Sequence, residues 1–295
     1  MDLFRVDFHI FLLASEPAEP ISVRLSMKID LLNKKFERIG ARLKVNRRPQ
    51  RRRRQFRDSL SLDIGSDRKG EFFEVRPSDS HEPEVQILDV RPAARHLLLM
   101  ARENDVKSKF LCGHDERHWF VAAIPENAPV GTVQQAMTAL QPSEVRSAVA
   151  RKRLKGRQRY RRKNDAFLRQ GEWFFLPLPN LSVDKSQVLE NEPLSRGIGS
   201  KPHWAEFAWR TGGQTVYVCN RYPSGVSSKR YQSILSGNSK AKSWGWVSVQ
   251  RNPGVYVRGK IRHPDHATIM LHGWHRVVMN TENQSSAMRH VAFLD

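Results

Sequence analysis

The chain has 295 residues, of which 50 are Lys or Arg and 30 are Asp or Glu, so its formal net charge at pH 7 is +20. Hydrophobic residues make up 39% of the sequence and include 14 Phe and 7 Trp, which excludes a wholly disordered protein. No apolar run reaches the roughly 18 residues of a membrane-spanning helix, and two Cys outside any C-x-x-C pattern exclude a disulfide scaffold. The charge favours nucleic acid, DNA or RNA, as partner over a membrane.

Residues 1–58 are predicted to form a basic N-terminal arm that is disordered in part. Seven arginines lie between Arg47 and Arg57, and Pro49 excludes a continuous helix through them. Such a run is typical either of a solvated linker or of an arm that follows a phosphate backbone or enters a minor groove. The predicted phosphate contacts in this arm are Arg51, Arg52, Arg53 and Arg54.

The same N-terminal stretch carries a short amphipathic helix, predicted over residues 28–44 from apolar residues at helical spacing. The apolar patch at residues 8–14 lacks the positively charged leader of a signal peptide. Translation from Met1 and translation from Met27 both stay open. Together with the two isolated cysteines, these features favour a cytoplasmic protein.

Residues 59–141 are predicted to be a mixed α/β region. Strands are expected at 60–65, 71–77, 83–90 and 118–124, and helices at 93–105 and 132–141. Thr132 and Gln135 form a capping-box pattern for the second helix. Asp63, and the group Cys112, His114 and His118, are candidate metal ligands. Neither matches a common pattern of ligand spacing, so roles in a strand and a turn are favoured.

Residues 142–171 are predicted to form one long, arginine-rich helix. Ser143 suits its start and Gly171 its end, while Gly156 marks a bend or a break. Between Arg146 and Arg169 the segment holds eleven basic residues and one acidic residue. Like charges one turn apart repel each other, so a helix of one sign is expected to face phosphates. The predicted contacts are Arg151, Lys152, Arg153, Lys155, Arg157, Arg159, Arg161, Arg162 and Lys163.

Residues 172–295 are predicted to be a β-rich domain, which makes the whole chain an α+β protein. Hairpin turns are expected at Gly212-Gly213 and at 252–254, and a short capped helix at 227–237. Aromatic residues set among Lys and Arg could fill a core or stack on bases. They are Trp204, Trp209, Tyr217, Tyr222, Tyr231, Trp244 and Trp246. Further phosphate contacts are assigned to Arg196, Lys201, Arg258 and Arg276.

Four of the eleven histidines lie within thirteen residues, at positions 263, 266, 272 and 275. Histidine exchanges protons near neutral pH and is the commonest metal ligand. The two pairs are expected in turns at opposite ends of a strand of about five residues, some 15–17 Å apart, so all four cannot share one metal ion. One histidine from each pair could still converge with His203 or with a histidine near 114–118.

Three interpretations of this cluster stay open. His263 or His266 could act as general base with another histidine as general acid, while Asp265 orients an imidazole and Arg262 stabilises the transition-state phosphate. The histidines and Asp265 could instead hold a divalent metal ion that activates water. In the third interpretation they pack, cap turns and touch phosphates without chemistry.

The sequence as a whole predicts a cytoplasmic nucleic-acid-binding protein that uses the basic arm and the arginine-rich helix on the phosphate backbone. This interpretation requires no cofactor. One alternative is an enzyme that cleaves phosphodiesters, or processes a flipped base, through the cluster around His263 and His266. The other is a non-catalytic structural factor of a ribonucleoprotein particle.

Overall fold

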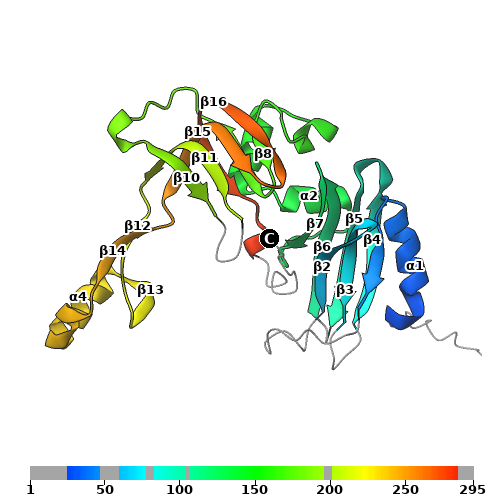
Figure 1. Cartoon of the computed structure of the whole chain (residues 1–295), viewed down its shortest axis with the longest axis horizontal. Coiled ribbons are helices and arrows are strands. Elements are labelled where there is room, and N and C mark those ends of the chain that lie inside the picture. Colours follow the sequence, from blue (N-terminus) through cyan, green and yellow to red (C-terminus); the bar gives the residue numbers. More distant parts are fainter. Residues whose placement is uncertain (1–24, 47–59, 78–82, 104–105, 196–200, 285–295) are drawn as a thin grey trace, which may run out of the picture.

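The computed structural model describes residues 25–46, 60–77, 83–103, 106–195 and 201–284 (Figure 1). The arginine run of the predicted basic arm, with Arg51 to Arg54, and Arg196 lie outside the described residues. Within them the protein is β-rich with four short α-helices, so the predicted α+β class with a mixed α/β region and a long helix is wrong. No described helix is long and apolar enough to cross a membrane.

The N-terminal half consists of two sheets and a helix packed against them (Figure 1). One sheet contains β1 (Leu43–Val45), β2 (Ser61–Asp67) and β3 (Gly70–Arg76) in the order β1-β3-β2, and the other is a meander of β4 (Glu84–Arg91), β5 (His96–Glu103), β6 (Val106–Asp115) and β7 (His118–Ile124). Phe36 of α1 (Leu25–Glu37), Phe73 and Phe110 are fully buried in their common core. The predicted strands are confirmed, and the predicted 28–44 helix is confirmed only as far as Glu37.

The helix predicted at 93–105 is wrong, because this segment is strand β5. Leu97, Leu98 and Leu99 are all buried, since the common core covers one face of the sheet and α2 (Val133–Ala139) covers the other. A strand buried on both faces loses its alternation of apolar and polar residues and resembles a helical segment in sequence. Ahead of it lies only the 3-10 turn η2 (Pro92–Ala94). The capping box of α2 is confirmed.

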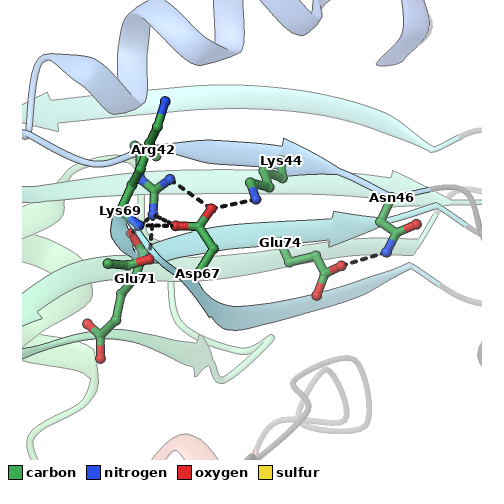
Figure 2. A network of polar contacts seen from close by, with 8 residues as sticks. Arg42, Lys44, Asn46, Asp67, Lys69, Glu71 and Glu74 are labelled. Atoms are coloured by element: carbon green, nitrogen blue, oxygen red, sulfur yellow. Dashed lines mark hydrogen bonds and ion pairs between the residues drawn. The ribbon is translucent and has the colours of Figure 1, made fainter.

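A polar network holds β1 against the β2–β3 turn (Figure 2). Arg42 donates from Nη1 and Nη2 to the carboxylate of Asp67 at 3.0 and 2.8 Å, and Lys44 donates to the same carboxylate at 2.7 Å. The hydrogen bonds from Arg42 and then Lys44 hold the pKa of Asp67 far below its usual range. Because β1 has only three residues, these side chains supplement its short parallel pairing with β3.

The arginine-rich helix predicted at 142–171 is also wrong, because its helical part, α3 (Ser143–Arg151), ends at Arg151. Arg153 and Gly156 have φ angles of 52° and 53°, which an α-helix does not contain. A 3-10 turn, η3 (Gly156–Tyr160), follows, and the chain then enters a sheet. One continuous helix would stack like charges on every turn, whereas this path spreads them.

The C-terminal half is built on a six-stranded antiparallel sheet (Figure 1). Its strands, in the order β10-β11-β15-β16-β9-β8, are β8 (Leu168–Gln170), β9 (Trp173–Pro177), β10 (Leu189–Leu194), β11 (His203–Thr211), β15 (Gly254–His263) and β16 (His266–Met279). Two 3-10 turns, η4 (Lys185–Gln187) and η6 (Glu282–Gln284), complete it. Phe175, Ala205, Val257 and Ile261 are fully buried in its core.

A smaller unit, which we call the β-arm (residues 214–251), extends from this sheet (Figure 1). It contains β12 (Gln214–Cys219), β13 (Tyr222–Ser227), α4 (Ser228–Gly237), the 3-10 turn η5 (Ser239–Ser243) and β14 (Val247–Arg251). The two predicted hairpins at its base are wrong. Thr211 pairs with Gly254 and Gln214 pairs with Arg251, so the strands on either side of Gly212-Gly213 are successive parts of one antiparallel ribbon.

Candidate metal centre

Three histidines from three strands of the six-stranded sheet converge at one point. His203 is the first residue of β11, His263 the last of β15 and His266 the first of β16. One nitrogen of each imidazole lies within 4.8 Å of a nitrogen of both others. The ring centroids of His203 and His263 are 4.2 Å apart, and those of His203 and His266 are 5.5 Å apart. We call these residues the three-histidine cluster.

The local sequence explains how the cluster forms. His263 and His266 are register partners at the end of the β15–β16 hairpin, with Pro264 and Asp265 in its turn. The amide of Asp265 donates to Nδ1 of His263 at 3.2 Å and orients that ring. His203 reaches the same place because the next residue, Trp204, pairs with the residue before His263. His203 is only 1% exposed, whereas His263 and His266 are half-buried, so the cluster lies at the edge of the protein interior.

Gly171, in the turn between β8 and β9, leaves the space in front of two of these rings open. Its φ of +56° lies in the left-handed region that favours glycine. A Cβ at this position would lie 2.9 Å from Nε2 of His266 and 3.5 Å from Nε2 of His203. The two Nε2 atoms therefore face one small volume that a side chain at position 171 would fill.

The β6–β7 turn from the N-terminal half meets the three-histidine cluster. Oε2 of Glu116 lies 3.6 Å from Nδ1 of His266, and Glu116 holds a positive φ of 44°. Arg162 forms ion pairs with Glu116 and, at 2.7 Å, with Asp115, and Arg169 donates to Asp115 at 3.0 Å. These half-buried ion pairs join the two halves of the protein beside the histidines.

A cavity of about 480 Å³ opens in front of His263 and His266. Its walls come from both halves of the protein. The carboxylates that line it are Asp63, Glu71, Asp115, Glu172, Asp265 and Glu282, whereas the lysines and arginines that line it are Arg169 and Lys201. The cavity is therefore rich in carboxylates, of which Asp63, Asp115 and Asp265 are held in ion pairs with arginine or lysine.

Burial and neighbouring charges set the protonation of groups around the cavity. Desolvation, with a contribution from His263, lowers the pKa of His266, so this ring is neutral at pH 7. Burial opposes ionisation of Asp265, but the hydrogen bond and charge of Lys201 at 3.0 Å outweigh it and lower the pKa of this carboxyl. Neutral imidazoles and ionised carboxylates are the forms that bind metal ions.

The structure brings together three of the four residues predicted to be catalytic. His263, His266 and Asp265 line the cavity, but Arg262 does not. Side chains alternate along a strand, so Arg262 points away from His263, and it donates to the side chain of Asn191 at 2.8 Å. The geometry therefore separates Arg262 from any chemistry in the cavity.

The second histidine pair lies elsewhere on β16. His272 is exposed, and His275 is buried with its Nδ1 3.0 Å from the carbonyl of Gly273. Convergence thus involves both histidines of the first pair with His203, rather than one from each pair. The second turn expected around His272 and His275 is wrong, because both residues lie within β16 (His266–Met279). The longer-range pairing of β11 with β15 is not visible in local sequence.

The other metal candidates from the sequence do not form a cluster within the described residues. Cys112 is fully buried, and burial strongly raises the pKa of its thiol. Nδ1 of His118 lies 2.6 Å from a carboxylate oxygen of Glu71. Asp63 is 3% exposed and lies 3.6 Å from Arg76.

Sequence reasoning missed three contributors to the site. Gly171 was expected to end a helix, and Arg169 was counted among the basic residues of that helix, although it forms a half-buried ion pair with Asp115. Glu116 was considered only with Cys112 and the nearby histidines, because its neighbour His266 is 150 residues away.

The predicted phosphate contacts divide into two groups. Seven lie exposed at the end of α3 and in the segment after it, namely Arg151, Lys152, Arg153, Lys155, Arg157, Arg161 and Lys163. The others already have partners inside the protein. Arg159 lies over Tyr160, Arg162 pairs with Asp115 and Glu116, Lys201 with Asp265, and Arg276 with Glu144, while Arg258 lies over Phe207 and Trp274.

The β-arm forms a second basic surface, which the sequence had not singled out. It contains six basic residues and no acidic residue. All six are exposed, namely Arg221, Lys229, Arg230, Lys240, Lys242 and Arg251. Its aromatic residues are half-buried against each other, as in the stacked pair Tyr217 and Tyr231, whose centroids are 3.9 Å apart. They build the small core of the arm.

Comparisons with protein-family models, with curated proteins and with solved structures found no match to this chain.

Proposed function

We propose that the protein binds nucleic acid and that the β-arm is its main described contact surface. The observation that supports this proposal is the set of six exposed cations on a projecting unit without a single carboxylate. Six like charges held on one small unit repel each other, and a phosphate backbone relieves that repulsion. The seven exposed cations from Arg151, at the end of α3, to Lys163 supply a second, independent stretch of the same sign.

The outer face of the six-stranded sheet supports contact with bases. Trp204 is 41% exposed, which is unusual for so large an apolar side chain, and its register partner is the exposed Arg262. An exposed indole beside a cation can stack on an unpaired base. Of the seven aromatic residues considered for stacking, Trp204 is the one with an exposed ring; the other six are half-buried.

A second candidate function is hydrolysis of a phosphodiester in the cavity. The observation that favours it is the three-histidine cluster, of which His263 and His266 line the cavity together with the ionised Asp265. In this reaction water supplies a hydroxyl group to phosphorus and a proton to the departing ester oxygen. Rings whose nitrogens face one point suit a metal ion better than an acid–base pair, which must reach opposite sides of a phosphate.

A cytoplasmic location remains part of the proposal. Cys112 and Cys219 are buried free thiols, as in proteins from reducing compartments. A structural factor of a ribonucleoprotein particle would bind nucleic acid without cleaving it, whereas the enzyme would turn it over. An activity assay therefore separates the two functions.

Binding is tested by fluorescence anisotropy with labelled single- and double-stranded DNA and RNA over a range of salt concentrations. A variant with Lys229, Arg230, Lys240 and Lys242 changed to Ala should bind more weakly. The magnitude of the slope of log K against log salt should fall by about 2.8 to 3.6, since each of the four phosphate contacts contributes about 0.7 to 0.9. The matched control removes four exposed cations elsewhere, at Lys34, Arg38, Arg68 and Lys69. Equal losses in both variants would show a general charge effect and refute the β-arm as contact surface.

A further inference from the structure

We propose that His203, His263 and His266 form the binding site of one divalent transition-metal ion of the zinc class. This inference concerns the cavity and does not require that the protein bind nucleic acid. Three imidazoles suit zinc, copper, iron or nickel, whereas calcium and magnesium prefer oxygen ligands. Three protein ligands also leave a position open on a tetrahedral ion, as in catalytic rather than structural zinc sites.

The spacing of the histidines is close to that of a metal site. Two ligands about 2.0–2.1 Å from a tetrahedral ion are about 3.3–3.4 Å apart. The three nitrogens already lie within 4.8 Å of one another, so a closure of at most about 1.5 Å by ring rotation completes the site. Nδ1 of His263 accepts a hydrogen bond from the Asp265 amide. Coordination by His263 therefore requires either that the metal ion replace this hydrogen bond or that the imidazole ring rotate by half a turn.

The space for the ion is present on the side of Gly171. Nε2 of His203 and Nε2 of His266 both face the point where a Cβ of residue 171 would stand. Gly171 has a left-handed backbone and no side chain, and two imidazole nitrogens point to the place where a side chain would stand. The space there is a small hollow lined by polar atoms. A cation between the two rings would use both nitrogens.

The surroundings also favour a cation. Oε2 of Glu116 lies 3.6 Å from Nδ1 of His266, which is beyond hydrogen-bonding distance but close enough for its negative charge to favour a cation at the ring. Arg162 and Asp115 in turn hold Glu116 and its turn in place. A divalent cation bound beside the carboxylates of the cavity would offset their charge and favour a phosphate there.

The experiment is a titration of the full chain, first stripped with a chelator, with Zn²⁺ alone by isothermal calorimetry and with Co²⁺ by visible absorption. The expected result is one ion per chain and the intense visible bands of tetrahedral Co²⁺. His266→Ala should weaken Zn²⁺ binding roughly a hundredfold or more, since even the loss of an outer partner costs about 10- to 100-fold. His263→Ala should behave in the same way.

His272→Ala is the matched control, because His272 is an exposed histidine of the same strand and outside the cluster. Circular dichroism and thermal unfolding of each variant establish that it is folded. Unchanged affinity in His266→Ala, or no saturable binding by the wild type, would overturn the site. Metal binding without cleavage of any nucleic acid would keep the site and refute hydrolysis as its function.

Discussion

Replacing Gly171 by Ala should impair metal binding much more than it impairs folding. Both Gly171 and Gly156 have left-handed backbones, with φ of +56° and +53°, so an Ala at either position costs about 1–2 kcal/mol of stability. Only at position 171 does the new Cβ meet another group, Nε2 of His266 at 2.9 Å. Nothing lies within 4 Å of a Cβ at position 156.

The contact at position 171 can be converted into an expected loss of affinity. Ordinary van der Waals contact requires about 3.5 Å, so His266 must retreat by about 0.6 Å. Metal–ligand distances tolerate about 0.2 Å, and the retreat therefore exceeds this tolerance roughly threefold. We expect Zn²⁺ affinity to fall about 10- to 100-fold in Gly171→Ala and to stay within about twofold in Gly156→Ala.

The assay compares Zn²⁺ affinity by calorimetry and unfolding temperature in chelator for both variants. The unfolding temperature should fall by about 2–4 °C for each kcal/mol of stability lost, and by similar amounts in the two variants. Equal Zn²⁺ affinity in Gly171→Ala and Gly156→Ala would show that the hollow beside residue 171 is not where the ion binds. The reasoning from the two Nε2 atoms would then be refuted.

Three further predictions concern pH, base contact and stability. Burial lowers the pKa of His266 and of His275, so below about pH 6.5 the unfolded chain binds more protons than the folded protein. The free energy of unfolding, measured in chelator, should therefore fall as the pH drops from 7 to 5. A flat profile would contradict the burial of these rings. Trp204→Ala should weaken binding of single strands by about 1–3 kcal/mol and leave duplex affinity nearly unchanged in the same anisotropy assay; equal losses on both would contradict stacking. Thr132→Ala should remove the N-cap of α2 and lower the free energy of unfolding by about 1 kcal/mol in urea denaturation, and a neutral effect would show that the cap is not stabilising.

The sequence predicted elements well where one local pattern dominated. The turn between β2 and β3, the capping box at Thr132 and Gln135, and the strand at His118–Ile124 depend on residues a few positions apart. It failed where tertiary packing changed the pattern. The leucines of β5 are covered on both faces, and a strand in that position is as apolar as a helix core.

The prediction of a long arginine-rich helix was wrong for an electrostatic reason that the sequence already contained. Repulsion between adjacent turns was read as a sign of bound phosphate, but in the protein itself it also favours the turns at Arg153 and Gly156. Two of the predicted phosphate ligands, Arg162 and Lys201, instead neutralise carboxylates around the cavity. Composition alone does not separate cations that face solvent from cations that hold the fold together.

The candidate site could be predicted only in its local half. The H-P-D-H turn placed His263 and His266 together because they flank a two-residue turn. His203 lies sixty residues before them, and Glu116 and Gly171 lie further still. Their approach depends on the pairing of β11 with β15 and on the contact between two hairpin turns. No period or spacing in the sequence encodes either arrangement.

The length of the ribbon between the β-arm and the three-histidine cluster sets a minimum size for any ligand that contacts both. Strands β11 and β15 begin or end at the base of the arm, at Thr211 and Gly254, and carry His203 and His263 at their other ends. Eight residues of extended chain separate Thr211 from His203, which is about 26 Å at 3.3 Å per residue. A duplex of about eight base pairs has that length at 3.4 Å per pair. A ligand that contacts both the base of the arm and the three-histidine cluster must therefore span about 26 Å, which excludes mononucleotides as bridging ligands.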